Sequence, residues 1–148
     1  MKLCIACSTG GHLLQLLQLK QIYSKYNHFF LTFKRPMSKS LAKQEKAFFV
    51  KDPGKNPINL LINIFQSLSI FLQQQPDVII STGAGVAVPI CYIAKFFGKR
   101  VVFIESFSRV QQPSLSGTFV YPIADLFIVQ WRQLLKFYKR AKYGGSIF

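Results

Sequence analysis

The chain has 148 residues, half of them hydrophobic, which suits one domain (residues 1–148) with a sizeable core and excludes a disordered tail. Nineteen Lys and Arg against five Asp and Glu give a formal net charge of +14, so the surface attracts anions such as nucleic acid, anionic lipid or phosphorylated substrates. The charge alone does not choose among these partners. Three cysteines without a disulfide framework indicate a reducing compartment.

Predicted strands and helices alternate along the chain. We expect strands over Lys2–Ala6, His28–Phe33, Ala47–Val50, Asp77–Ser81, Arg100–Glu105 and Asp125–Gln130. We expect helices over His12–Lys25, Met37–Lys46, Ile58–Gln74, Val86–Phe97, Ser114–Tyr121 and Trp131–Lys142. Six strands with intervening helices predict an α/β fold, a Rossmann-like, doubly wound parallel sheet.

Cys4 and Cys7 have the C-x-x-C spacing, but both fall at the first predicted strand, where residues three apart point to opposite faces. A redox pair would lie at the start of a helix instead. We therefore predict buried thiols.

The longest apolar stretch, Ile58–Leu72, contains several Asn, Gln and Ser residues and is shorter than the roughly 20 residues that span a bilayer. It predicts a buried or interfacial helix. We expect no signal peptide, because only a short apolar run follows Lys2 before a loop of Ser, Thr and Gly.

Two glycine loops are the most informative feature of the sequence. One follows the first strand, Ser8-Thr9-Gly10-Gly11-His12, and the other follows the fourth, Ser81-Thr82-Gly83-Ala84-Gly85. In the common strand order 3-2-1-4-5-6, strands one and four are neighbours at the switch point, where ligands bind beyond the carboxyl ends of the strands. Glycines let backbone N–H groups approach an anion. We therefore predict a phosphate or pyrophosphate site between the loops, rather than two tight turns without a ligand.

His12 opens the first predicted helix, where the helix N-terminus disfavours the imidazolium. A neutral imidazole beside a phosphate-binding loop is a candidate general base for a sugar hydroxyl. A histidine that only caps the helix or packs remains the alternative.

Glu105 ends the fifth strand and is expected to face the same cleft. Its candidate roles are a hydrogen bond to sugar hydroxyls, a second proton acceptor, or a structural ion pair with Arg109. The following loop, residues 106–117, is long for a strand-to-helix connection, which indicates function. Within it, Ser108 and Arg109 are candidate phosphate contacts, and a solvated loop is the alternative. Asp77 and Asp125 begin strands at the opposite edge and are expected to be structural.

A dinucleotide site fits poorly, because G-x-G-x-x-G is absent and the second strand ends in Lys34-Arg35 instead of an acid for the ribose. The basic pair tolerates a 2′-phosphate, so a nicotinamide enzyme remains a minor option. No Ser-His-Asp pattern or metal-ligand cluster is evident, and we expect neither a metal nor a tightly bound cofactor.

The predicted final helix, Trp131–Lys142, is basic and amphipathic, a pattern typical of helices that lie on anionic membranes or against partners. A core-packing helix with a solvated basic face is equally compatible. Together with the apolar Ile58–Leu72 helix and the lysines between Lys34 and Lys55, this helix favours a protein of the membrane surface.

Five segments occur in the order known from one protein family: Ser8–His12, Ser81–Pro89, Glu105–Val110, Pro113–Gly117 and Asp125–Trp131. They resemble the asparagine-linked-glycosylation fourteen family, the membrane-anchoring subunit of the bipartite UDP-GlcNAc transferase that acts on dolichol-linked sugars. Bacterial relatives in that family assist exopolysaccharide and capsule glycosyltransferases. The resemblance covers nearly the whole chain.

This resemblance implies the N-terminal, acceptor-side half of a GT-B glycosyltransferase like the peptidoglycan transferase MurG, divided between two polypeptides. A separate catalytic subunit would supply most of the UDP-sugar site, and the length agrees because a GT-B enzyme needs two Rossmann-like domains. Gly10, Gly11 and His12 match the end of the MurG-type glycine motif. Eukaryotic members begin with a membrane-spanning helix, whereas here we expect a peripheral surface on the cytoplasmic face of the membrane. In the family the C-terminal tail joins the catalytic partner, which implies the partner-binding residues Tyr143, Gly144, Gly145, Ile147 and Phe148.

The leading hypothesis is an inverting sugar transfer from a UDP-sugar to a lipid-pyrophosphate-linked saccharide, active only in a heterodimer. His12 and Glu105 are its candidate catalytic residues. Its candidate substrate- and phosphate-binding residues are Ser8, Thr9, Gly10, Gly11, Thr82, Gly83, Gly85, Ser108 and Arg109. One alternative is a basic nucleic-acid-binding module, which rests on charge alone and lacks a recognisable motif, so we expect no nucleic acid partner. The other is a non-catalytic membrane scaffold.

Overall fold

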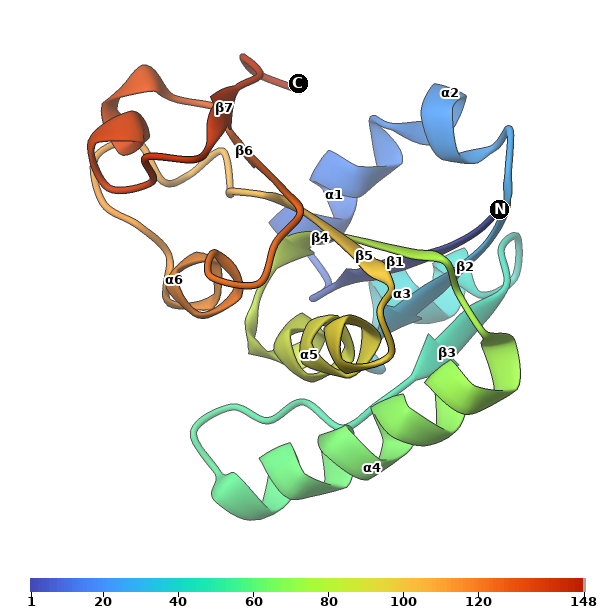
Figure 1. The fold of residues 1–148 in the computed structure, drawn as a ribbon. Helices are drawn as coiled ribbons and strands as arrows, with labels where there is room; N and C mark the ends of the chain where they lie inside the picture. Colours follow the sequence, from blue (N-terminus) through green and yellow to red (C-terminus); the bar gives the residue numbers. More distant parts are fainter. Residues whose placement is uncertain (148) are drawn as a thin grey trace.

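The strands form one parallel sheet, described for residues 1–147 by this computed structural model (Figure 1). Across the sheet the strands are β3 (Ala47–Phe49), β2 (Asn27–Thr32), β1 (Lys2–Cys7), β4 (Val78–Gly83), β5 (Arg100–Ile104), β6 (Leu126–Val129) and β7 (Lys142–Tyr143). The predicted order of the first six strands is confirmed. The two-residue strand β7, which we did not predict, extends the edge beyond β6.

Helices cover both faces of this sheet, as the doubly wound prediction requires (Figure 1). They are α1 (Gly11–Leu17), α2 (Lys20–Tyr23), α3 (Pro36–Leu41), α4 (Pro57–Gln74), α5 (Val88–Phe96) and α6 (Leu115–Val120), with short 3₁₀ turns η1 (Gly85–Ala87) and η2 (Arg132–Lys136). The first three pack on one face of the sheet, and α4, α5 and α6 pack on the other.

Side chains of β1 alternate between these two cores. Leu3, Ile5 and Cys7 pack with α1, whereas Cys4 and Ala6 pack on the side of α4 and α5. Strands buried on both faces therefore explain the continuous apolar runs. The prediction of buried thiols is confirmed: all three cysteines are free and buried, and burial raises their pKa values, that of Cys91 to about 12.

The predicted helix His12–Lys25 is two shorter helices. The backbone leaves the helical conformation at Leu19 (φ −87°, ψ 13°), where the chain tightens and the Leu19 N–H bonds to the carbonyl of Leu16. No Gly or Pro marks this break in the sequence, so periodicity alone joined the two pieces.

The predicted helix Trp131–Lys142 is wrong. The segment makes one 3₁₀ turn, η2, and then leads into β7. Tertiary contacts override its helical pattern: Trp131 Nε1 donates to the Phe107 carbonyl at 2.6 Å, and Leu134 and Tyr138 are buried in the core. The segment therefore belongs to the folded body and does not supply the amphipathic membrane helix that the sequence suggested.

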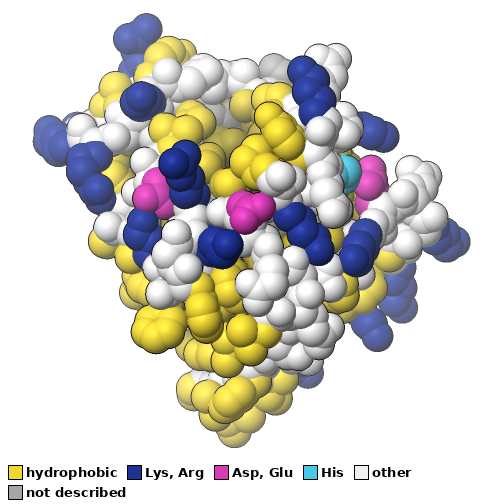
Figure 2. Space-filling model, turned by 45° about the vertical axis from the view of Figure 1, so that its right-hand side comes forward, with side chains coloured by type: hydrophobic (Ala, Val, Ile, Leu, Met, Phe, Trp, Pro, Cys, Tyr) yellow, Lys and Arg dark blue, Asp and Glu magenta, His cyan; other side chains and the backbone are white. Residues whose placement is uncertain are grey.

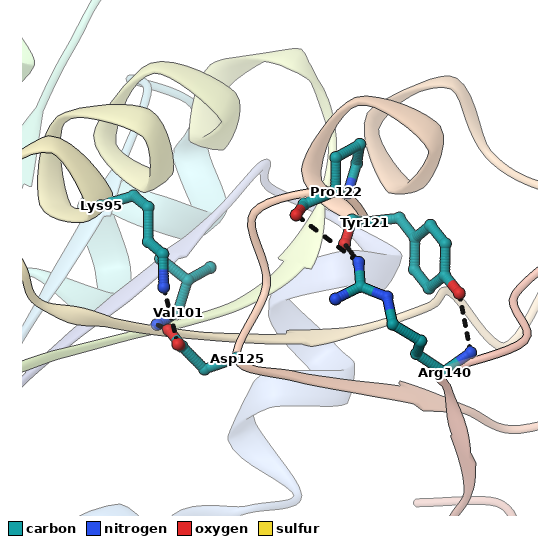
Figure 3. Close-up of polar contacts among 6 residues, drawn as sticks. All are labelled: Lys95, Val101, Tyr121, Pro122, Asp125 and Arg140. Carbon is teal, nitrogen blue, oxygen red and sulfur yellow. Dashed lines mark hydrogen bonds and ion pairs between the residues drawn. The ribbon is translucent and has the colours of Figure 1, made fainter.

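Two acids fasten the amino edge of the sheet, as predicted. Asp77 Oδ2 accepts a hydrogen bond from the Lys2 backbone N–H at 2.8 Å. Asp125 Oδ2 accepts from the Val101 N–H at 2.8 Å, and its Oδ1 pairs with Lys95 at 2.7 Å (Figure 3). Both carboxylates thus have structural roles away from the glycine loops.

The chain after η2 is fastened to the segment that follows α6. The Arg140 backbone N–H donates to the Tyr121 hydroxyl at 2.7 Å, and its guanidinium donates to the carbonyls of Tyr121 and Pro122 (Figure 3). The guanidinium also lies over the Tyr121 ring, 4.9 Å from its centroid. These contacts align the following residues with the open edge of β6.

Candidate functional site

The two glycine loops meet at the carboxyl ends of β1 and β4, as predicted. Cys7 pairs with Gly83 across the neighbouring strands, after a register shift between Ala6 and Cys7. Two hydrogen bonds join the end of β4 to the start of α1: His12 Nδ1 bonds to the Thr82 carbonyl at 2.7 Å, and Thr82 Oγ1 donates to the His12 carbonyl at 2.9 Å. His12 and Thr82 therefore hold both loops in one rigid unit at the switch point.

The bond to Thr82 decides the tautomer of His12. A backbone carbonyl only accepts, so Nδ1 carries the proton and Nε2 of the neutral ring is the free acceptor. Burial lowers the pKa of His12 from its ordinary 6.5, and nearby Arg109 acts in the same direction. The bond to Thr82 and the charge of Glu105 oppose this shift without cancelling it. The ring is therefore neutral at pH 7 and able to take a proton on Nε2.

The β4 loop is held in a strained conformation. Ala84 has φ 70° and ψ 157°, a region that is populated almost entirely by glycine. Its N–H donates to Ser116 Oγ at 3.1 Å, which fixes the loop against α6. Gly83, at φ 110°, donates its N–H to Ser81 Oγ. Strain of this kind persists only where the surrounding structure enforces it, and it concentrates at functional sites.

The predicted phosphate contacts divide into two groups. Gly10, Gly11 and Gly85 are exposed, and Ser8 and Thr9 are half-buried, so these residues can meet a ligand. Thr82 and Gly83 are buried, and their hydroxyl and N–H groups are already used inside the protein. They therefore position the site and do not offer it a donor.

Glu105 occupies a different place from the one expected. Its side chain is fully buried, and its carboxylate accepts hydrogen bonds from Ser106 N at 2.9 Å, Ser114 N at 3.1 Å and the Tyr138 hydroxyl at 2.8 Å. Burial, and next the charge of Glu105, raise the pKa of Tyr138 far above its ordinary value. The geometry therefore favours Glu105 as the residue that closes the loop 106–114, over the catalytic role predicted from the sequence.

Arg109 belongs to the loop that Glu105 closes. The ion pair with Arg109, one of the three candidate roles of Glu105, is not among the ion pairs of residues 1–147, and the Arg109 side chain is exposed. Ser108 is also exposed, and its hydroxyl lies 3.0 Å from that of Ser106. The loop thus presents a hydroxyl and a free guanidinium near enough to His12 for the Arg109 charge to act on its pKa. Among the residues described, no three His, Cys, Asp or Glu side chains are grouped as metal ligands.

A buried amide pair that we did not predict joins this site to the C-terminal segment. Gln15, one turn after His12, accepts from Gln130 Nε2 at 2.7 Å and from Phe107 N at 3.0 Å. Gln130 Oε1 in turn accepts from Ile147 N at 3.1 Å. A glutamine on the buried face of an otherwise apolar helix was the signal available in the sequence.

The predicted partner-binding residues lie along the free side of β6. Tyr143 of β7 pairs with Val129 of β6, and Gly144 N donates to the Val129 carbonyl at 3.0 Å. Tyr143 thus lies in the edge strand, Gly144, Gly145 and Ile147 follow it beside the end of β6, and Phe148 lies outside the described residues. An edge strand offers unpaired backbone groups to another chain.

The model of the family described as "Oligosaccharide biosynthesis protein Alg14 like" matches residues 38–147. The chain belongs to this family. The Alg14-like chain is 40% identical over 114 residues to the UDP-N-acetylglucosamine transferase subunit alg14 of Schizosaccharomyces pombe, covering 71% of this chain and 54% of the relative. It is 36% identical over 93 residues to the human subunit ALG14, covering 59% of this chain and 43% of the relative. The chain therefore spans about half the length of the curated relatives it matches.

Solved structures share the fold of this Alg14-like chain. MurG of Acinetobacter baumannii has a TM-score of 0.74 at 18% identity, over 90% of this chain and 43% of that one. The UDP-N-acetylglucosamine 2-epimerase of Rickettsia bellii has a TM-score of 0.80 at 12% identity, over 99% of this chain and 45% of that one. The predicted Rossmann-like fold of the MurG type is therefore confirmed.

Proposed function

We propose that this chain is the acceptor-side subunit of a two-part glycosyltransferase, which transfers a sugar from a UDP-sugar to a lipid-pyrophosphate-linked saccharide. Its relatives are named as subunits of a UDP-N-acetylglucosamine transferase, which makes UDP-GlcNAc the first donor to test. A catalytic partner supplies most of the donor site and docks on the edge segment 143–147. The donor is shared between the subunits, and no other cofactor takes part.

The observation that carries this proposal is the His12–Thr82 link between the two glycine loops. In the proposed reaction, the acceptor hydroxyl attacks the anomeric carbon of the donor while its proton passes to Nε2 of His12. The bond between that carbon and the UDP oxygen breaks with its electron pair on UDP. Gly10, Gly11 and Arg109 are exposed, and backbone N–H groups together with a guanidinium suit the pyrophosphate charges.

The same proposal places the protein peripherally on the cytoplasmic face of a membrane. No helix within residues 1–147 is both long enough and apolar enough to cross a bilayer. Helix α4 nevertheless exposes large apolar side chains, among them Ile58 (68% exposed) and Phe65 (64% exposed). Figure 2 shows hydrophobic side chains gathered over the lower part of the molecule, with Lys and Arg above them and along their right side. An exposed apolar patch with a basic border supports contact with an anionic membrane.

The test is a transfer assay with purified chain and a co-purified partner, using labelled UDP-GlcNAc and a lipid-pyrophosphate acceptor in detergent. We expect turnover only when both polypeptides are present, and His12→Ala in the complex lowers the rate by about 10²–10⁴-fold. His28→Ala is the matched control, because His28 bonds to the Tyr26 carbonyl and Glu45 at the other edge of the sheet. Full turnover by this chain alone overturns the split enzyme, and an unchanged rate for His12→Ala supports the scaffold alternative.

A further inference from the structure

A cavity lies at the carboxyl ends of β2 and β3, on the β1 side of the glycine loops, and β2 is the direct neighbour of β1. Its volume is about 620 Å³, and it opens between the segments that follow β2 and β3 and the first turns of α4. Its basic lining residues are Lys34, Arg35 and Lys51, and its walls include Phe33, Phe49 and Asn59. The site proposed for sugar transfer does not use this cavity.

The charge of this cavity is not neutralised. The ion pairs within residues 1–147 involve Glu45, Asp77 and Asp125, and none includes a cation of the cavity. Instead, Lys34 lies 5.8 Å from the Phe49 ring centroid and Arg35 lies 5.1 Å from that of Phe33. The lining contains one carboxylate, Asp52, against three cations. A cavity with excess positive charge and aromatic walls selects an anion.

Hydrogen bonds from α4 fix the segment that carries Lys51, which runs back over α4 (Figure 1). Gln66 Oε1 accepts from the Lys51 N–H at 2.6 Å, and the fully buried Asn63 donates to the Lys51 carbonyl at 2.8 Å. Asn63 also donates to the carbonyl of Val86 at 3.2 Å, within the turn that follows the β4 glycine loop. The Ser67 hydroxyl donates to Asn63 Oδ1, so both the amide nitrogen and the amide oxygen of Asn63 are hydrogen-bonded within the protein. The cavity is therefore built on α4 and connected through Asn63 to η1, which follows the β4 glycine loop.

The rim of this cavity continues into the apolar surface of α4. Asn59 and Gln66 line the cavity, and Ile62 lies three residues from one and four from the other on the helix. Ile58, Ile62 and Phe65 are exposed beside them. A ligand that fills the cavity with its anionic part thus has an apolar surface for a chain.

We propose that the basic cavity binds the phosphate headgroup of an anionic lipid, with the hydrocarbon chain of the lipid against the exposed side of α4. This inference rests on the membrane association in the proposed function, and it adds a specific headgroup site at the carboxyl ends of β2 and β3. The phosphate is recognised by Lys34, Arg35 and Lys51. The hydrogen bonds of Asn63 to the carbonyls of Lys51 and Val86 hold the bound lipid at a set distance from the β4 glycine loop.

The test measures binding of the whole chain to phosphatidylcholine vesicles that contain phosphatidic acid or phosphatidylglycerol, adjusted to equal surface potential. We expect tighter binding to phosphatidic acid, because the greater charge of its phosphomonoester suits a cavity with three cationic side chains. The variant K34Q/R35Q/K51Q weakens that binding by about 100-fold, since each cation near an anionic surface contributes about fivefold. The control K20Q/K25Q/K139Q removes the same charge from exposed residues outside the cavity, and it weakens binding by less than about threefold.

Three results overturn the proposal. One is equal binding to both lipids at equal surface potential, and another is equal loss in the two triple variants; each indicates diffuse attraction alone. The third is saturable binding of inorganic phosphate, measured without vesicles, with an affinity equal to that for the vesicles. That result assigns the cavity to a free anion. The wild-type lipid preference needs no variant, so a folding defect in a variant leaves the test intact. The assay uses neither partner nor sugar, so its failure is distinct from failure of the transfer assay.

Discussion

The buried carboxylate of Glu105 provides the sharpest test of how this fold holds its site. The Glu105 carboxylate accepts three hydrogen bonds, from Ser106 N, Ser114 N and the Tyr138 hydroxyl. Glu105→Gln replaces this carboxylate by an amide of the same shape. The amide keeps one oxygen and gains an NH₂ group, which faces a donor in either orientation. At least one buried N–H or O–H group is therefore left without an acceptor.

The cost follows from these contacts. A buried donor left unpaired costs about 1–3 kcal/mol, and the remaining bonds weaken because the acceptor is no longer charged. We expect Glu105→Gln to lower the free energy of unfolding by about 2–4 kcal/mol, a large share of the 5–15 kcal/mol typical of a domain. With an ordinary dependence on denaturant, the urea midpoint falls by about 1–2 M.

Urea unfolding followed by tryptophan fluorescence measures this effect. Trp131 is the single tryptophan of the chain, and its bond to the Phe107 carbonyl places it beside the loop that Glu105 closes. Tyr138→Phe removes one of the three donors and should cost less than Glu105→Gln. Glu45→Gln is the matched control, because it changes the same functional group in a partly exposed pair with His28 and should cost less than about 1 kcal/mol.

The transfer assay separates a structural role for Glu105 from a catalytic one. We expect the rate per folded molecule to fall less than tenfold in Glu105→Gln, far less than in His12→Ala. An unchanged urea midpoint together with a collapse of transfer would refute this reasoning and restore the catalytic role predicted from the sequence.

Three further predictions concern the loops and the sheet edge. Because burial lowers the pKa of His12, its ring stays neutral below pH 6.5. The loss of transfer rate at acid pH should therefore lie below pH 6.5, and this acid dependence should be absent in His12→Gln. Ala84→Gly should raise the free energy of unfolding by about 1 kcal/mol through relief of strain, whereas Gly83→Ala should lower it by about 1–3 kcal/mol, since its Cβ would lie 2.9 Å from Ser116 Oγ. Thermal melts of both variants test these opposite changes: the melting temperature should rise in Ala84→Gly and fall in Gly83→Ala. Burial acts to raise the pKa of Asp125, but hydrogen bonds from Lys95 and Val101 outweigh this effect and lower the pKa. The ionised carboxylate therefore stabilises the fold above pH ~4, and this stability is lost as the pH falls. Asp125→Asn should flatten the acid dependence of the urea midpoint.

Several features of the fold could be read from the sequence because they depend on local patterns. Apolar runs placed the first six strands, and the Gly-rich turns after Cys7 and Ser81 marked the switch point. Asn56 caps the first turn of α4, Pro57 is the first residue of that helix, and Gly98 ends the turn after α5 at φ 72°. Each signal needs only neighbouring residues.

The functions of single polar residues could not be read in the same way. Glu105 was expected in the cleft from its place at the end of β5, yet its carboxylate turns inward to donors that follow it by 1, 9 and 33 positions. Gln15 and Gln130 bond across 115 positions, and Asn63 connects two loops from the middle of an apolar helix. Such partners are distant in sequence, so no spacing rule finds them.

The sequence by itself determined the class of fold, the order of the first six strands and the pair of glycine loops, because strand burial and turn chemistry are set by short-range patterns. Only the tertiary structure decided the tautomer of His12, the inward orientation of Glu105 and the fate of the segment after Trp131. Those depend on which buried donors and acceptors meet when distant segments pack, since a buried polar group must find a partner wherever the fold supplies one.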